Sequence, residues 1–377
     1  MTESIIEESP VEKTASAYRR ETIELGEDRA GKRQRLDVLR FGSPGARPKA
    51  YLQTALHADE LPGMLIMRKL IERLSEFATQ GKIKGEIVLV PVANPIGHAQ
   101  IVGQYMQGRV EDGTDRNFNR GFPNLAELVR DRVNGKLGED ADENVAVIRR
   151  EMREALTDTT CTDAFEKLQL TLMENASDAD IALDLHADNH ALLYLYTNKR
   201  SWPDATDLAA ELDARAVLLS GYSGDGSFDE SCGGPWLLLS EMFPDHPVPQ
   251  ACLSSTLELR SNNDVSGTFA RRDSEALIRF LQHRGCLAGE PGALPRLLGN
   301  AIPVENMHRL TASIEGVVDY KLKPGDSVRT GDLIAEIIPV TGEIELILSP
   351  LDGLIIALHD QTWAWPDKMI GKLVGAT

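Results

Sequence analysis

The chain has 377 residues, enough for one large domain and a smaller second one, and its charged and apolar fractions of 26% and 42% are those of an ordinary globular protein. Its formal net charge of −18 repels nucleic-acid phosphates and anionic membrane surfaces, which excludes both as expected partners. The four cysteines are widely spaced and form no C-x-x-C pair, so we expect neither a cysteine zinc cluster nor a disulfide framework.

The same features predict where the protein works. Residues 1–10 lack the cationic region and apolar core of a secretion signal. No later stretch reaches the roughly 18 consecutive apolar residues that cross a bilayer. Free cysteines fit a reducing compartment. We therefore expect a cytoplasmic protein with no membrane-spanning segment.

The N-terminal part of the chain alternates between strand and helix patterns. Segments 19–26 and 34–41 flank a polar turn and predict a hairpin at a sheet edge. Residues 50–56 form a strand-like run, and 60–77 carry apolar residues at helical spacing. The nearly continuous apolar run in 85–94 is typical of a strand covered on both faces. Strand, helix and strand together predict a parallel βαβ unit.

The first strand of this unit ends in His57-Ala-Asp-Glu60. A zinc ion in a hydrolytic site is commonly bound by two His and one Glu, with the fourth position left for water. Open α/β sheets place their sites at the carboxyl ends of strands. His57 and Glu60 are therefore candidate ligands, although an isolated four-residue pattern also recurs by chance.

A polar stretch from about 97 to 138 follows and contains few apolar repeats. Loops of this length are usually functional or disordered, so we interpret it as a functional loop region with short helices. It includes the sequence Asn117-Phe-Asn119-Arg120-Gly-Phe-Pro123. Two helical patterns come next, at about 143–156 and 163–176.

A second buried strand, over 180–188, carries another histidine near its end, His186. It lies 129 residues after His57, and two neighbouring strands of one sheet would bring the two side chains together. Asp184 is on the same face of this strand, where it could orient a metal-bound imidazole. The alternative is an ordinary buried aspartate that hydrogen-bonds for structural reasons.

Further along, we expect a strand at 191–197, a helix at 204–214 and a strand at 251–259. Glu258 lies in this last run among apolar and hydroxyl side chains, where a carboxylate is costly to bury unless something pairs with it or uses it. Beside a metal-bound water it would be a good general base. The alternative is an exposed glutamate at a strand end. A closing helix at 271–283 precedes a linker rich in Gly and Pro.

The C-terminal segment contains short strands and a weak internal repeat, in which 315–337 can be laid beside 352–373. This pattern resembles the two half-motifs of the biotinyl/lipoyl barrel-sandwich fold. A swinging-arm carrier needs a lysine on the hairpin between the halves, and the chain has none between Lys323 and Lys368. We therefore predict a structural or substrate-gating role. The predicted domains are a zinc hydrolase domain over 1–288 and a β-rich domain over 289–377.

Four blocks together resemble the succinylglutamate desuccinylase/aspartoacylase family, within the wider zinc carboxypeptidase fold. They occur in the family's order between about 50 and 260, and they are His57-x-x-Glu60, Asn119-Arg120-x-Phe-Pro123, Asp184-Leu-His186 and Thr256-Leu-Glu258. The resemblance implies an α/β fold, with a zinc-carboxypeptidase-like mixed sheet flanked by helices. It also implies a smaller C-terminal all-β domain, consistent with the barrel-sandwich pattern above.

The resemblance also assigns roles to residues. It implies that His57, Glu60 and His186 bind one Zn²⁺ per chain and that Glu258 activates the water.

It further implies that Asn119 and Arg120 hold a substrate carboxylate, while an upstream arginine polarises the scissile carbonyl. Arg109 is our candidate for that arginine, and Arg116 is its rival. Members often have a glycine after the Glu-Leu pair, where this chain has Arg260, a residue that would narrow or recharge the pocket.

We therefore predict a zinc-dependent amidohydrolase that removes an acyl group from an N-acylated amino acid or a related small amide. A zinc carboxypeptidase acting on peptides is the closest alternative, because it uses the same zinc ligands. A non-catalytic binding protein on the same fold is a second alternative. Assembly into a homo-oligomer is left open.

Overall fold

A computed structural model describes residues 17–375 of the chain. The N-terminal residues from which we predicted the lack of a secretion signal lie outside this range. Across the described residues, no helix combines the length and the apolar character needed to span a bilayer.

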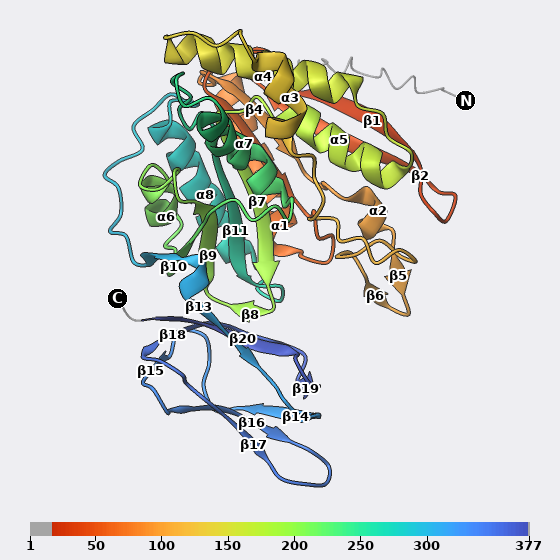
Figure 1. The fold of residues 1–377 in the computed structure, drawn as a ribbon, viewed down its shortest axis with the longest axis vertical. Helices are drawn as coiled ribbons and strands as arrows, with labels where there is room; N and C mark the ends of the chain where they lie inside the picture. Colours follow the sequence, from red (N-terminus) through yellow and green to blue (C-terminus); the bar gives the residue numbers. More distant parts are fainter. Residues whose placement is uncertain (1–16, 376–377) are drawn as a thin grey trace, which may run out of the picture.

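The structure is built on a mixed nine-stranded sheet. Its strands, in chain order, are β1 (Arg19–Glu27), β2 (Arg33–Phe41), β3 (Lys49–Thr54), β4 (Glu86–Val90), β7 (Ile181–Asp188), β9 (Leu193–Asn198), β10 (Ala216–Ser220), β11 (Leu253–Ser261) and β12 (Asn300–Pro303). They lie in the order β1-β2-β4-β3-β7-β11-β9-β10-β12 (Figure 1).

The pairing within this sheet confirms two predictions from the sequence. β1 and β2 form an antiparallel hairpin with β1 at the edge, and β3 and β4 are parallel neighbours joined through a helix. β3 also pairs in parallel with β7, which pairs in parallel with β11. Every residue of β3, β4 and β7 is buried, which explains their nearly continuous apolar sequences. The carboxyl ends of β3, β7 and β11 therefore meet at one edge of the sheet.

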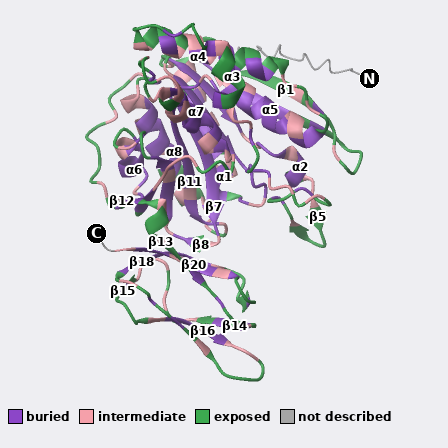
Figure 2. Ribbon diagram, in the orientation of Figure 1, coloured by how far each residue is buried: buried purple, intermediate pink, exposed green. Residues whose placement is uncertain are grey.

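Helices cover both faces of the sheet (Figure 2). On one face α1 (Pro62–Thr79), α6 (Thr206–Glu211) and α8 (Gly267–His283) bury their apolar sides in a single cluster with the strands. The opposite face is covered in the same way by α3 (Leu125–Val133), α4 (Ala141–Asp158), α5 (Ala164–Ala176) and α7 (Phe228–Met242). The short helix α2 (Pro95–His98) leads into the polar stretch that we interpreted as a loop region, and the hairpin of β5 (Ile101–Val102) and β6 (Tyr105–Met106) lies within it.

The helix α7 and the strand β10 were not predicted from the sequence. The helix α7 contains Gly233, Gly234 and Pro235, which are poor helix formers. A Cβ added at Gly233 would lie 2.2 Å from the Oγ of Ser254, so the glycine permits close packing of α7 on β11. The requirement for glycine thus comes from a tertiary contact.

The C-terminal module, which we define as residues 307–375, forms two further sheets. Its strands are β13 (Met307–Thr311), β14 (Gly316–Tyr320), β15 (Ser327–Val328), β16 (Leu333–Ile338), β17 (Glu345–Leu348), β18 (Gly353–Leu358), β19 (Trp363–Ala364) and β20 (Met369–Gly375). One sheet has the order β13-β20-β18-β15 and the other β17-β16-β14-β19. The short 3-10 helix η1 (Val304–Asn306) precedes the module.

The two sequence repeats each contribute strands to both of these sheets. The first repeat contains β14, β15 and β16, and the second contains β18, β19 and β20. In each repeat the outer strands pair with each other, while the middle strand joins the other sheet, β15 with β18 and β19 with β14. β12, which lies within the predicted second domain, belongs to the large sheet. The division at residues 288 and 289 stays a prediction.

The C-terminal module is attached close to the end of β7. The short strand β8 (His190–Ala191), which follows β7, pairs antiparallel with β18. The N–H of Leu192 also donates to the carbonyl oxygen of Ile356 at 2.9 Å. Figure 1 shows the module below the large sheet on this side. The attachment places the module next to the edge where β3, β7 and β11 end.

Candidate metal centre and active site

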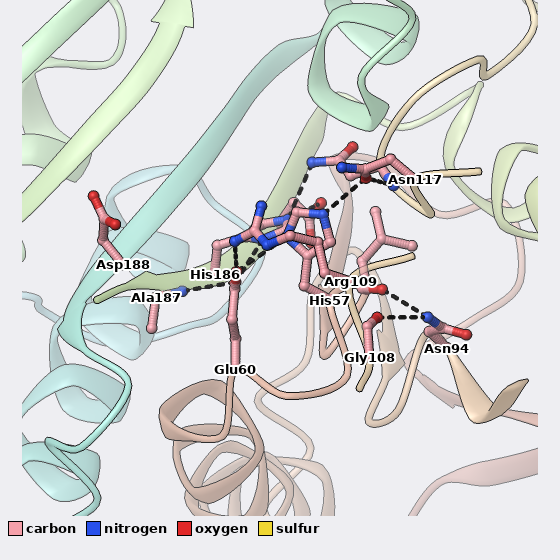
Figure 3. A network of polar contacts seen from close by, with 12 residues as sticks. His57, Glu60, Asn94, Gly108, Arg109, Asn117, His186, Ala187 and Asp188 are labelled. Carbon is pink, nitrogen blue, oxygen red and sulfur yellow. Dashed lines mark hydrogen bonds and ion pairs between the residues drawn. The ribbon is translucent and has the colours of Figure 1, made fainter. Parts of the chain in front are cut away.

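Two histidines and a glutamate meet where β3 and β7 end (Figure 3). His57 and Glu60 lie in the turn between β3 and α1, and His186 lies on β7. One potential ligand atom from each side chain lies within 4.8 Å of the other two. All three residues are at least 95% buried. The sheet thus brings together the three residues that the sequence proposed as ligands.

The two histidines direct equivalent nitrogens at the same carboxylate. The Nδ1 atom of His57 lies 3.0 Å from Oε1 of Glu60, and Nδ1 of His186 lies 2.7 Å from Oε2. Ligand atoms around a tetrahedral zinc ion are about 3.3 Å apart, since each lies about 2.0–2.1 Å from the metal. Both distances are close to this separation, and two histidines with a carboxylate are the ligand types of catalytic zinc sites, so the donor set fits a zinc ion.

The outer nitrogens of the histidines contact oxygen atoms. Nε2 of His57 lies 3.0 Å from Oδ1 of Asn117, and Nε2 of His186 lies 2.8 Å from Oδ2 of Asp184. An oxygen acceptor favours the proton on Nε2, which leaves the lone pair of Nδ1 free for a metal. Asn117 was not proposed from the sequence. Its signal was present in the Asn-x-Asn pattern before Arg120.

Electrostatics keep Glu60 ionised. Burial alone would raise its pKa, but the charges of His186 and His57 outweigh burial and hold the pKa well below its usual range. The opposite happens at His186, where burial lowers the pKa but the charges of Asp184 and Glu60 raise it well above its usual value. A metal ion would therefore compete with a proton on this imidazole.

The turn that carries His57 is fixed by backbone contacts. The N–H of Ala58 donates to the carbonyl oxygen of Gly108 at 3.1 Å. The side chain of Asn94, fully buried, donates to the carbonyl oxygens of Leu56 and Gly108 at 2.9 and 3.3 Å (Figure 3). A Cβ added at Gly108 would lie 2.6 Å from the Cβ of Ala58, so this approach requires glycine.

The close approach at Gly108 places Arg109 beside the metal ligands. Its Nη2 lies 2.7 Å from Oε1 of Glu60, and its side chain is 52% exposed. Arg116 points elsewhere, because its guanidinium binds Glu111 and Asp163 at 2.7 Å. Of the two arginines considered, the structure brings Arg109 to the candidate site.

The other proposed substrate-binding residues lie at different depths. Asn119 is buried, its Nδ2 lies 3.3 Å from Nε2 of His186, and its Oδ1 accepts from the N–H of Phe228 at 2.8 Å. Arg120 is exposed, and its Nη1 donates to the carbonyl oxygen of Asn119 at 2.6 Å. Among the described residues, Arg120 forms no hydrogen bond or ion pair with His57, Glu60 or His186.

Glu258 lies beside the candidate metal ligands on the central strand β11. It is in register with His186 on β7 and with Tyr194 on β9. Its side chain is partly exposed, and within residues 17–375 it forms no hydrogen bond or ion pair. Burial and the negative charge of Asp188 raise the pKa of Glu258 to about 7. A carboxyl group with these properties can take and release a proton near neutral pH.

Arg260 occupies an unusual backbone conformation two residues further on. Its φ angle is 68°, in the left-handed region that favours glycine. Its guanidinium binds Asp273 and lies 4.4 Å from the centre of the Phe269 ring, both on α8. The side chain is therefore packed against α8 and has no contact with the three candidate ligands among the described residues.

The sequence matches a known protein family. The model of the succinylglutamate desuccinylase/aspartoacylase catalytic domain matches residues 46–284. A search of curated proteins found no match.

Among solved structures, the chain is similar to a protein of the succinylglutamate desuccinylase/aspartoacylase family from Shewanella amazonensis. The TM-score is 0.82, and the identity is 26% over 94% of this chain and 98% of the other. A second such protein, from Shewanella frigidimarina, has a TM-score of 0.82 and 22% identity over 96% and 98% of the two chains. The ectoine utilization protein EutE (DoeB) from Ruegeria pomeroyi has the same fold, with a TM-score of 0.66 and 19% identity over 96% and 95%. Because the family model covers well over half of the sequence, the chain belongs to the succinylglutamate desuccinylase/aspartoacylase family.

Proposed function

We propose that the protein is a zinc-dependent hydrolase that cleaves the amide bond of an N-acylated amino acid or a related small amide. Members of its family are deacylase hydrolases. The observation that carries the proposal is the meeting of His57, Glu60 and His186 beside an unpaired glutamate, Glu258. A partly exposed carboxyl group beside a metal-binding triad is placed to act on a substrate at the metal, which a protein that only binds does not require.

In this proposal His57, Glu60 and His186 would hold the metal, the two histidines through the Nδ1 atoms that face the Glu60 carboxylate. Two His and one Glu are a common ligand set of catalytic zinc sites that leave the fourth position open. When bound there, zinc supplies Lewis acidity, which lowers the pKa of a water molecule and polarises an amide carbonyl. Asp184 and Asn117 hold the two imidazoles in the required tautomer and orientation.

Glu258 is the proposed general base and acid. Its carboxylate takes a proton from the attacking water and then passes it to the leaving amine. Without bound metal its pKa is about 7, and the positive charge of a bound zinc ion would lower it, which favours the carboxylate form that takes the proton from water. The exposed part of its side chain leaves room for substrate.

Arg109 is the proposed electrophilic group. Its guanidinium is half exposed and next to Glu60, so it can donate hydrogen bonds to the oxygen on which negative charge develops. Arg120, supported by Asn119, would hold a substrate carboxylate in the bidentate geometry that lysine cannot provide. An acidic protein needs such a localised positive group to retain an anionic substrate.

For the C-terminal module we propose the barrel-sandwich assignment made from its repeat, supported by the exchange of the middle strands. The hairpin between the repeats has no lysine, which argues against a carrier role. A cytoplasmic location also stays a proposal.

Metal analysis tests the first part of the proposal. Purified protein should carry one zinc per chain, and His57→Ala should abolish this, whereas His308→Ala, which alters an exposed histidine on β13, should not. Equal metal content in wild type and His57→Ala would refute the site.

Substrate screening tests the second part. N-acetyl, N-succinyl and N-formyl amino acids should be hydrolysed by wild type and not by Glu258→Gln. Turnover of dipeptides with a free C-terminal carboxylate, without turnover of the N-acyl amino acids, would favour the carboxypeptidase alternative. A zinc-loaded protein that binds these amides and hydrolyses none would favour the binding-protein alternative.

A further inference from the structure

A lysine from the C-terminal module enters the large-sheet domain next to Glu258. The Nζ atom of Lys372, on β20, lies 2.7 Å from Oδ2 of Asp188 and donates to the hydroxyl of Tyr194 at 2.9 Å. The hydroxyl of Tyr194 in turn donates to the same Oδ2 of Asp188 at 2.6 Å. The side chains of Lys372 and Asp188 are only 13% and 9% exposed. The three groups therefore form a closed, largely buried network.

This network brackets Glu258 from both sides. Asp188 ends β7, the strand that carries His186, and Tyr194 lies on β9 directly opposite Glu258. β11 runs between these two strands, with Glu258 also opposite His186. Besides burial, which raises the pKa of Glu258 most, the charge of Asp188 raises it and that of Lys372 lowers it. The strands that carry Asp188 and Tyr194 therefore flank the strand that carries Glu258.

The position of Lys372 is set by pairings in both parts of the molecule. Within the module it lies opposite Arg309 on β13 and Ala357 on β18. β18 pairs with β8, and the same boundary contains an apolar cluster that includes Tyr194, Leu218, Ile302, Ile356 and Val374. The backbone that presents Lys372 is thus fixed relative to β7 and β9.

Stability alone does not account for a lysine here. Removing two charges from water is costly, and replacing a buried ion pair by apolar residues of similar size is often neutral or stabilising. The surrounding cluster is already apolar, so a methionine or leucine would extend it. The charged network does provide a fixed orientation for the ends of β7 and β9.

We infer that Lys372 is a positioning residue of the active site, which acts through Asp188 and Tyr194 to hold Glu258 in place. The C-terminal module is on this view a necessary part of the catalytic apparatus. The inference rests on the proposed function of Glu258.

The test compares Lys372→Met with Lys368→Met in the full-length, zinc-loaded protein. Lys368 is a matched control, because it is also buried on the module. Within residues 17–375 its ammonium group contacts module residues alone, namely Gln361, Trp363 and the ring of Trp365. We expect kcat to fall by about 10- to 100-fold in Lys372→Met, the size found when groups that orient active-site residues are lost. KM and zinc content should change far less, and Lys372→Arg should recover part of kcat. Lys368→Met should keep the kcat of wild type.

A second readout does not depend on activity. Hydrogen–deuterium exchange should increase within residues 186–196 and 253–261 in Lys372→Met. In Lys368→Met the increase should be confined to the C-terminal module. If Lys372→Met does not fold, Tyr194→Phe provides a second test, because it removes the hydroxyl group that contacts both Lys372 and Asp188. It should also lower kcat.

The outcomes separate this inference from the proposed function. Wild-type protein that hydrolyses no amide would refute the proposed function, whereas an active wild type with equal kcat in Lys372→Met would refute only the role of Lys372. Unchanged exchange in 186–196 and 253–261 would also overturn the inference. Equal losses of kcat in Lys372→Met and Lys368→Met would show that Lys372 has only a general structural role, and would overturn the inference.

Discussion

Asp184→Asn tests how the protein prepares a histidine for metal binding. Asp184 is fully buried, and its Oδ2 lies 2.8 Å from Nε2 of His186. The substitution keeps the size of the side chain but removes its negative charge. It therefore converts a charge-assisted hydrogen bond into a neutral one.

The expected loss can be estimated from this contact. Hydrogen bonds that involve a charged group contribute about 1.5–3 kcal/mol, and neutral ones about 0.5–1.5 kcal/mol. The difference of about 1–1.5 kcal/mol corresponds to roughly tenfold weaker zinc binding, because 1.4 kcal/mol is a factor of ten. The other carboxylate oxygen, Oδ1, is buried and has no hydrogen-bond partner among the residues that the structure describes. An amide nitrogen placed there would cost about 1–3 kcal/mol of stability.

Two measurements separate these effects. Competition with a chromophoric chelator gives the Kd for zinc, and thermal unfolding of the metal-free protein gives the change in stability. Asp180→Asn is the control, because Asp180 precedes β7 at its other end and binds Arg47, Arg149 and the N–H of Lys49. It should lower stability without changing the Kd. An unchanged Kd in Asp184→Asn would refute the role of this carboxylate.

Four further predictions concern the reaction and the metal site. Glu258→Gln should lower kcat by about 10²- to 10⁴-fold, which is the range for loss of a general base, and should leave the zinc content unchanged. Loss of zinc in this variant would contradict the assignment of Glu258 as a base. The pKa of Glu258 is raised to about 7 without bound metal, and the positive charge of a bound zinc ion would lower it. kcat/KM of the zinc-loaded wild type should therefore rise with pH below about 7 as Glu258 ionises, and a flat profile between pH 5 and 8 would count against this role. Arg109→Lys should reduce kcat, because Arg109 lies beside Glu60. Arg116→Lys should mainly reduce the melting temperature, because Arg116 forms an ion pair with Glu111. The reverse pattern would assign the catalytic role to Arg116. Gly108→Ala should impair both zinc affinity and kcat, because its Cβ would be forced against the turn that carries the ligands, and normal zinc binding would show that the turn can shift.

The sequence alone determined the strands that carry the candidate ligands. Every residue of β3 and β7 is buried, so both strands appear in the sequence as nearly continuous apolar runs that can be recognised without tertiary information. His57 and His186 stand out because each follows or ends such a run, and the hairpin at the sheet edge was equally clear. Family motifs added Glu258, which in isolation could equally have been an exposed glutamate.

Other features were decided only by the tertiary structure. The choice between Arg109 and Arg116 depended on the approach of Gly108 to Ala58, which joins segments 50 residues apart. The helix α7 has a locally unfavourable sequence because Gly233 is required by its contact with β11.

The network of Lys372 joins residues 184 positions apart, across the boundary between the large sheet and the C-terminal module. Periodicity and spacing report which residues share a face of one element. They carry no information about which distant element supplies the neighbouring charge, because that depends on how the sheets pair and pack. The candidate ligands were therefore readable from the sequence, while the surroundings that orient them and Glu258 were not.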